Sequence, residues 1–245
     1  MNSKVDDFKR KQFIILVWRS VYFGWWWINF IISCITKKPG YAVYWLVYLT
    51  TWAELLCCFY ATVSLIVVVL KLSDDQPENT AFLKNSRKSD AEIQKDLIVH
   101  EIVKLKKRST LEKLSAVLAE SSSVLAFIVS VLYYSFCDVE WDYDNIYLHL
   151  FNSVFGCLNL MIIQHSINFL RCYLVSLAVS LSYITMNIIV WKISGIVVYS
   201  VLDWGDESFI AIKIAVGSVI GAPLVFSSLT FGISRLRAKI VNGNR

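Results

Sequence analysis

A segment in the second half of the chain sets polar and small residues on an apolar background. Four of them recur within residues 144–159 at intervals of three, four and three positions: His149, Asn152, Gly156 and Asn159. This spacing places them on one face if the segment is helical. Polar side chains inside lipid usually face a protein interior or a cavity. The face therefore predicts a site, in which the neutral imidazole of His149 is a candidate general base.

A general base needs a nucleophile, and the candidate is Thr50 in an earlier apolar segment. Paired with His149, the Thr50 hydroxyl would form a nucleophile–base unit. Asn152, one helical turn from His149, would orient the ring or help to stabilise an oxyanion. Adjacent helical positions differ by about 100°, so the sequence leaves open whether Thr50 or Thr51 faces His149. A structural role also stays open, because such hydroxyls often bond to carbonyls of their own helix.

Three charged residues lie inside apolar segments: Arg19, Glu54 and Glu120. Depths counted at about 1.5 Å per helical residue allow an Arg19–Glu54 ion pair, with Glu120 as a competing partner for Arg19. Such a pair would pin helices together. The alternative is that Arg19 or Glu54 belongs to a site for an acyl carboxylate or a leaving group.

Composition indicates which elements must position these residues. Of the 245 residues, 56% are hydrophobic, more than the roughly 45–50% of soluble domains. Apolar runs of about 20 residues predict membrane-spanning helices. We expect an all-α fold, a six-helix transmembrane bundle forming a single integral membrane domain over residues 1–245. Its predicted spans are residues 13–35, 41–70, 114–137, 146–169, 173–193 and 209–233.

The distribution of Lys and Arg predicts the orientation of these spans. Basic residues gather at the N-terminus, in the 71–112 loop and in the C-terminal tail, whereas the 138–144 loop holds four acids and no base. By the positive-inside rule, both termini and the basic loop are cytoplasmic. In the last span, Gly217-x-x-x-Gly221 predicts close helix packing, and Pro223 predicts a bend.

The long polar segment between the second and third spans has two interpretations. Apolar residues recur at helical spacing over residues 91–113, with Lys and Arg around them. This pattern is typical of a basic amphipathic helix on a membrane surface, which would bind anionic lipids through residues 84–113. The alternative is a solvated extension of the third span.

Other classes of function find little support. The formal net charge of +5 comes without the basic soluble domain that nucleic-acid binding needs, so no nucleic acid is expected. The six Cys show no metal-ligand spacing, and neither metal nor cofactor is expected. Cys34 and Cys137 both fall near predicted outer helix ends, which leaves a disulfide between them open.

Several motifs resemble the rolling stone family of multi-pass membrane proteins. They are Tyr48-Leu49-Thr50-Thr51-Trp52, Asp144 and His149 with Asn152-Ser153, Val198-Tyr199-Ser200-Val201-Leu202-Asp203-Trp204, and the basic tail around Arg235 and Arg237. The resemblance runs from the first span to the last. It implies a plasma-membrane protein, in preference to one of the endoplasmic reticulum, that acts in cell–cell fusion of the myoblast type or in development.

That family is in turn similar to the androgen-induced membrane threonine hydrolases. Those proteins cleave fatty-acid esters of hydroxy fatty acids with a Thr in the second span and a His in the fourth. Thr50 and His149 match these two positions, so the resemblance implies a Thr50 nucleophile, a His149 base and an acyl-lipid substrate. The third hypothesis is a small channel or transporter lined by Glu54, His149 and Asn159.

Overall fold

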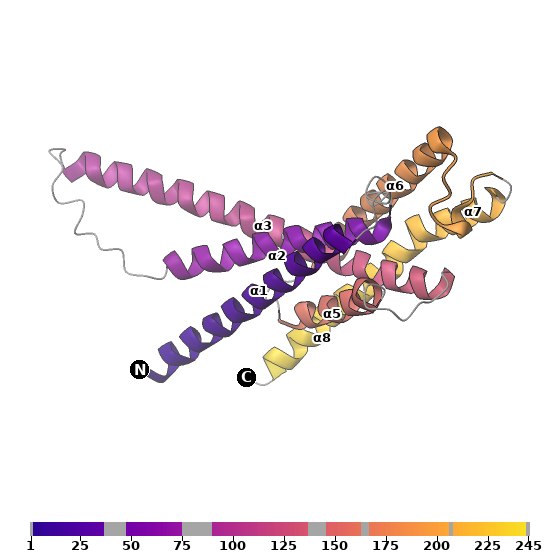
Figure 1. The fold of residues 1–245 in the computed structure, drawn as a ribbon. Coiled ribbons are helices and arrows are strands. Elements are labelled where there is room, and N and C mark those ends of the chain that lie inside the picture. The colour runs from indigo at the N-terminus through magenta and orange to yellow at the C-terminus, as the bar shows by residue number, and fades with distance from the viewer. Residues whose placement is uncertain are drawn as a thin grey trace. The chain divides into compact units, whose positions relative to one another are not determined.

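The structure is a computed structural model, and it describes most of the chain. In the described residues every regular element is a helix and none is a strand (Figure 1). The described residues are 2–36, 48–74, 90–136, 146–162, 167–205 and 208–243.

The helical elements follow one another in a simple order. They are α1 (Asn2–Thr36), α2 (Leu49–Asp74), α3 (Asp90–Phe136), η3 (Ile146–Phe151), α5 (Asn152–Ile162), α6 (Phe169–Ser194), η4 (Ser200–Leu202), α7 (Ser208–Val216), η5 (Gly217–Gly221) and α8 (Ala222–Gly243). Within the described residues, five helices are long and apolar enough to cross a membrane. The prediction of an all-helical, multi-pass membrane protein is confirmed at this level.

The chain divides into two compact units. The first comprises residues 1–25 and 61–115, and the second comprises residues 26–60 and 116–245. Within the first unit, an ion pair of 2.9 Å joins Lys71 of α2 to Glu112 of α3. The second unit holds the predicted catalytic residues, so it is the part that positions the site.

Two early helices differ from the predicted spans. Tyr48 lies in a bend and α2 begins at Leu49, whereas the second span was predicted from residue 41; residues 41–47 lie outside the described ranges. Helix α3 runs without a break for 47 residues, from Asp90 to Phe136. The basic stretch is therefore a helical extension of the third span, one of its two interpretations. Lipid binding by residues 84–113 stays a prediction.

The fourth predicted span is shorter than expected. Its helix consists of η3 and α5 and ends at Ile162, whereas the prediction placed its end at residue 169. Phe169 instead begins α6, because the side chain of Asn168 caps that helix by accepting a hydrogen bond of 3.0 Å from the backbone N–H of Arg171. Helix α6 ends at Ser194, and Gly195 follows as a left-handed C-cap with a positive φ of 69°.

The last span contains a π-helical segment where close packing was predicted. Among the described residues, no neighbouring side chain or helix would lie within 4 Å of a Cβ placed on Gly217 or Gly221, so the predicted close contact at these glycines is not found in this part of the chain. These two glycines are the first and last residues of η5, and the N–H of Ala222 donates to the carbonyl of Gly217. Pro223 has no N–H and its ring crowds the preceding turn, which favours this wider winding.

Candidate functional site

The predicted polar face of the fourth helical segment is buried. His149 is 6% exposed, Asn152 is 2% exposed and Asn159 is fully buried; Gly156 is buried with them. A Cβ on Gly156 would lie 3.8 Å from the Cβ of Ala126 in α3. The prediction that these four residues share one inward face is confirmed, and the absent side chain of Gly156 lets α5 lie close to α3.

His149 is held from both its backbone and its ring. It lies in the π-helical η3, a winding that often occurs at functional sites. Its carbonyl accepts a hydrogen bond from the hydroxyl of Ser130 in α3, and that hydroxyl lies 2.6 Å from the hydroxyl of Ser153. The imidazole stacks on Tyr133, with ring centroids 3.6 Å apart and planes 3° apart. These contacts fix the position of the imidazole.

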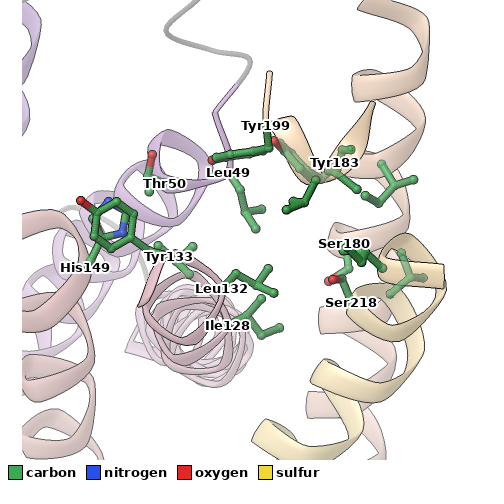
Figure 2. A pocket seen from close by; sticks show the side chains of 16 residues that line it. Leu49, Thr50, Ile128, Leu132, Tyr133, His149, Ser180, Tyr183, Tyr199 and Ser218 are labelled. Carbon is green, nitrogen blue, oxygen red and sulfur yellow. The ribbon is translucent and has the colours of Figure 1, made fainter. Parts of the chain in front are cut away.

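Thr50 and His149 both line one pocket of the second unit (Figure 2). The pocket has a volume of about 60 Å³. Thr50 is half-buried and lines it, whereas Thr51 is 2% exposed and is not among the lining residues. Of the two threonines, Thr50 is therefore the one that shares a pocket with His149.

The pocket has polar groups at its two sides and aliphatic walls between them. Figure 2 places Thr50, Tyr133 and His149 toward one side, and Ser180 and Ser218 toward the other. Apolar side chains from α3, α6 and the last span complete the lining: Ile128, Val129, Leu132, Ile184, Ile214 and Val219. The pocket is thus a small, mostly aliphatic space with hydroxyl and imidazole groups at its sides.

Three of the four motifs that carry the family resemblance supply residues to this pocket. Leu49 and Thr50 come from the first motif, His149 from the second, and Tyr199, Val201 and Leu202 from the third.

Two edge-to-face ring contacts support this assembly. The rings of Tyr48 and Tyr199 lie 5.9 Å apart, and those of Trp52 and Tyr183 lie 5.8 Å apart. A hydrogen bond of 2.9 Å from Trp204 to the amide oxygen of Asn187 holds the third motif against α6. Segments far apart in the sequence thus form the mouth and walls of one pocket.

Asn152 and Asn159 face α2. The amide oxygen of Asn152 lies 3.6 Å from the thiol of Cys57, which donates to it, and Asn152 is not among the pocket-lining residues. Its predicted support of His149 stays a prediction. The amide nitrogen and oxygen of Asn159 lie 3.0 and 3.2 Å from the hydroxyl of Tyr60. Asn159 therefore joins two helices.

Glu120 has a partner that the sequence analysis did not assign to it. Arg171 binds it through two parallel hydrogen bonds, of 2.8 Å from Nε and 2.6 Å from one terminal nitrogen. The backbone N–H of Asn168 donates to the same carboxylate at 3.1 Å. Both carboxylate oxygens are thus bound within the second unit, and the predicted competition of Glu120 for Arg19, which lies in the first unit, stays a prediction. A capped helix start brings Arg171 back to α3, which depth counting along separate spans did not reveal.

The other predicted charged pair stays untested. Arg19 belongs to the first unit and Glu54 to the second, and the Arg19–Glu54 pair remains a prediction. Glu54 and Asn159 are buried but are not among the residues that line the pocket. The proposed disulfide also stays a prediction, because Cys137 lies outside the described residues.

Several residues around the site carried no clear signal in the sequence. Tyr133 and Ser130 lie in an apolar run where an aromatic or a serine is ordinary, and their role appears only when α3 meets η3. Ser180 and Ser218 lie in different helices and had no spacing to join them. In the described parts of the chain, no cluster of three His, Cys, Asp or Glu side chains is placed to hold a metal ion.

Comparisons with known proteins leave the resemblance as a hypothesis. No protein-family model matches the chain, and neither a curated protein nor a solved structure matches it.

Proposed function

We propose that this protein is an intramembrane ester hydrolase of acyl lipids, with Thr50 as nucleophile and His149 as general base. The observation that carries the proposal is that both residues line one narrow, largely aliphatic pocket. Apolar walls accept an acyl chain, and a hydroxyl with an imidazole supplies the groups that ester cleavage needs. Fatty-acid esters of hydroxy fatty acids, the substrates of the similar threonine hydrolases, are the substrate class to test first.

The proposed reaction has two steps. The Thr50 oxygen attacks the ester carbonyl carbon while His149 accepts the hydroxyl proton, and the tetrahedral intermediate then collapses. The bond to the leaving alcohol breaks, His149 protonates that alcohol, and the acyl group remains on Thr50. Water, deprotonated by His149, next attacks the acyl-enzyme and releases the fatty acid, while the proton returns to Thr50.

The contacts around His149 support its role as a base. A base must hold one orientation through proton transfer, and the stack on Tyr133 with the Ser130 bond to the His149 carbonyl restrains the ring. The aliphatic walls also limit the entry of bulk water. The second step therefore depends on a water molecule reaching the pocket.

We also propose a cellular setting, which rests on the resemblance and on charge distribution. The chain is a rolling-stone-type protein of the plasma membrane with six spans and cytoplasmic termini, and it acts in cell–cell fusion or development. The meeting of the resembling motifs at one pocket supports this proposal. Tags at each terminus of the protein in intact cells, probed before and after permeabilisation, test the orientation. Tags accessible only after permeabilisation are expected.

A lipid-like fluorophosphonate tests the hydrolase proposal, because it reacts covalently with activated hydroxyl nucleophiles. The wild-type protein in detergent micelles is expected to be labelled, and Thr50→Ala is expected to lose the label. Thr51→Ala is the matched control, since Thr51 lies next in the same helix and is not a lining residue. Equal labelling of Thr50→Ala and wild type would refute Thr50 as nucleophile.

A further inference from the structure

An open groove lies on the second unit beside the π-helical segment. Its volume is about 330 Å³, and six residues line it: Leu132, Lys213, Ile214, Gly217, Ser218 and Ala222. Three of them, Leu132, Ile214 and Ser218, also line the narrow pocket. The groove and the pocket are therefore neighbours that share a wall.

The π-helical segment leaves room at the surface of the last span. A Cβ on Gly217 would meet no other atom within 4 Å, so the groove is open at this position. The extra residue per turn in η5 also interrupts the regular row of side chains along the helix. Such a gap between apolar side chains is a suitable place for a lipid chain to enter from the bilayer.

Lys213 gives this groove a single positive charge. Its ammonium lies 4.1 Å from the ring centroid of Phe209, and the other lining residues of the groove are uncharged. Across the described ranges, no carboxylate forms an ion pair with Lys213. Lys213 is exposed and lies in the second turn of α7, near the end of the last span, where its ammonium can meet a charged group that arrives from the membrane surface. An anionic group that arrives with a lipid is the natural partner.

We propose that this groove is the lateral entrance of the pocket, and that Lys213 binds the carboxylate of a single-chain lipid there. The acyl chain then passes between Leu132 and Ser218 toward Thr50 and His149, on the other side of the pocket (Figure 2). The proposal rests on the proposed hydrolase function, because it names the route by which the acyl-lipid substrate of that hydrolase enters and the head group that is recognised. Lys213 is a specificity residue and takes no part in the chemistry.

Binding of a fluorescent fatty acid to the full-length protein in nanodiscs tests the entrance. The wild type is expected to bind 11-(dansylamino)undecanoic acid, and Lys213→Met is expected to bind it about tenfold more weakly, since a charged hydrogen bond is lost. Gly217→Phe is expected to abolish binding, because its ring fills the groove without a clash at the Cβ. The corresponding dansyl alcohol is expected to bind the wild type about as weakly as the acid binds Lys213→Met.

Matched controls separate these effects from general damage. Lys192→Met removes an exposed lysine from the end of α6, and Gly232→Phe fills another open position, on α8. Neither residue lines the pocket or the groove. Both control variants are expected to bind the acid as the wild type does.

Each other result overturns the proposal. Absence of binding to the wild type, or equal binding to Lys213→Met, removes Lys213 as the anchor. Unchanged binding to Gly217→Phe removes the groove as the entrance, and tighter binding of a lysophosphatidate than of the fatty acid replaces the carboxylate by a phosphate. Fatty-acid binding needs no reaction at Thr50, so it can succeed or fail independently of the fluorophosphonate result.

Discussion

Glu120 and His149 are two buried titratable groups at helix contacts of α3: Glu120 belongs to α3, whereas His149 packs against it from η3. The carboxylate of Glu120 accepts hydrogen bonds from Arg171 and from the N–H of Asn168, and Glu120 does not line the pocket that holds His149. His149 contacts α3 through Ser130 and Tyr133 and also lines a pocket. The first arrangement locks a helix start in place, whereas the second leaves a titratable group beside space for a substrate.

Burial of a polar group in a membrane helix does not by itself indicate a functional site. Burial alone gives Glu120 and His149 similar status, since both are less than a tenth exposed. What separates them is whether the surrounding atoms satisfy the group completely or leave one side to a cavity. About ten residues of α3, roughly 15 Å at 1.5 Å per residue, separate the two regions. Substitutions around Glu120 should therefore chiefly affect stability, and substitutions around His149 should chiefly affect the reaction rate.

The largest expected effect is on chemistry, at His149. His149→Gln keeps a planar polar side chain but removes the base, so ester turnover should fall by a factor of about 10²–10⁴. Melting of the variant in detergent should stay close to that of the wild type. A fall in turnover that only matches a loss of folded protein would remove the distinction between the two regions.

Removal of one partner of the Glu120–Arg171 pair should chiefly affect stability. Arg171→Met leaves a buried, unpaired carboxylate and should cost about 3 kcal/mol of unfolding free energy. The double variant Glu120→Leu/Arg171→Met should recover much of this loss, because no charge stays buried without a partner. Denaturant unfolding of the single and double variants measures the coupling, and additive losses would contradict a direct pair.

Ser130 links α3 to the turn that carries His149, so it should affect both properties slightly. Ser130→Ala removes the hydrogen bond to the His149 carbonyl and should cost about 1 kcal/mol of stability. It should also lower kcat more than it raises KM, because the ring is held less firmly. Ser182→Ala is the control, since the Ser182 hydroxyl bonds only within its own helix, to the carbonyl of Ala178.

The smallest effect is expected at the Asn159–Tyr60 contact. Hydrogen bonds between helices in membranes contribute about 0.6 kcal/mol on average. Tyr60→Phe and Asn159→Ala should each cost about that much, and the double variant should cost less than the sum. Fully additive losses in thermal unfolding would mean that the two side chains do not depend on each other.

The sequence indicated the helices and the buried face well, because hydrophobic length and three-or-four spacing depend on local order. It placed His149, Asn152, Gly156 and Asn159 on one face, as the structure has them. The limits of the helices were less predictable. Asn168 was hidden within a predicted span, and its cap moved the start of α6 to Phe169.

Contacts between distant segments were the part that the sequence did not reveal. The partnership of Glu120 with Arg171 depends on how α6 returns to α3, and the stack of Tyr133 on His149 depends on the winding of η3. Gly217 and Gly221 show the same limit, since a motif typical of close packing has no close neighbour at its two glycines within the described residues. Residue spacing predicts which face a side chain occupies, but not what lies opposite.

The central claim is that the Thr50 oxygen is the nucleophile of the pocket. Tandem mass spectrometry of the fluorophosphonate-labelled wild-type protein tests it most directly, because it assigns the adduct to one residue. The account predicts a single adduct on Thr50 and a much slower rate of its formation in His149→Gln. An adduct on Thr51, Ser130 or Ser218, or formation at an unchanged rate without His149, would contradict it.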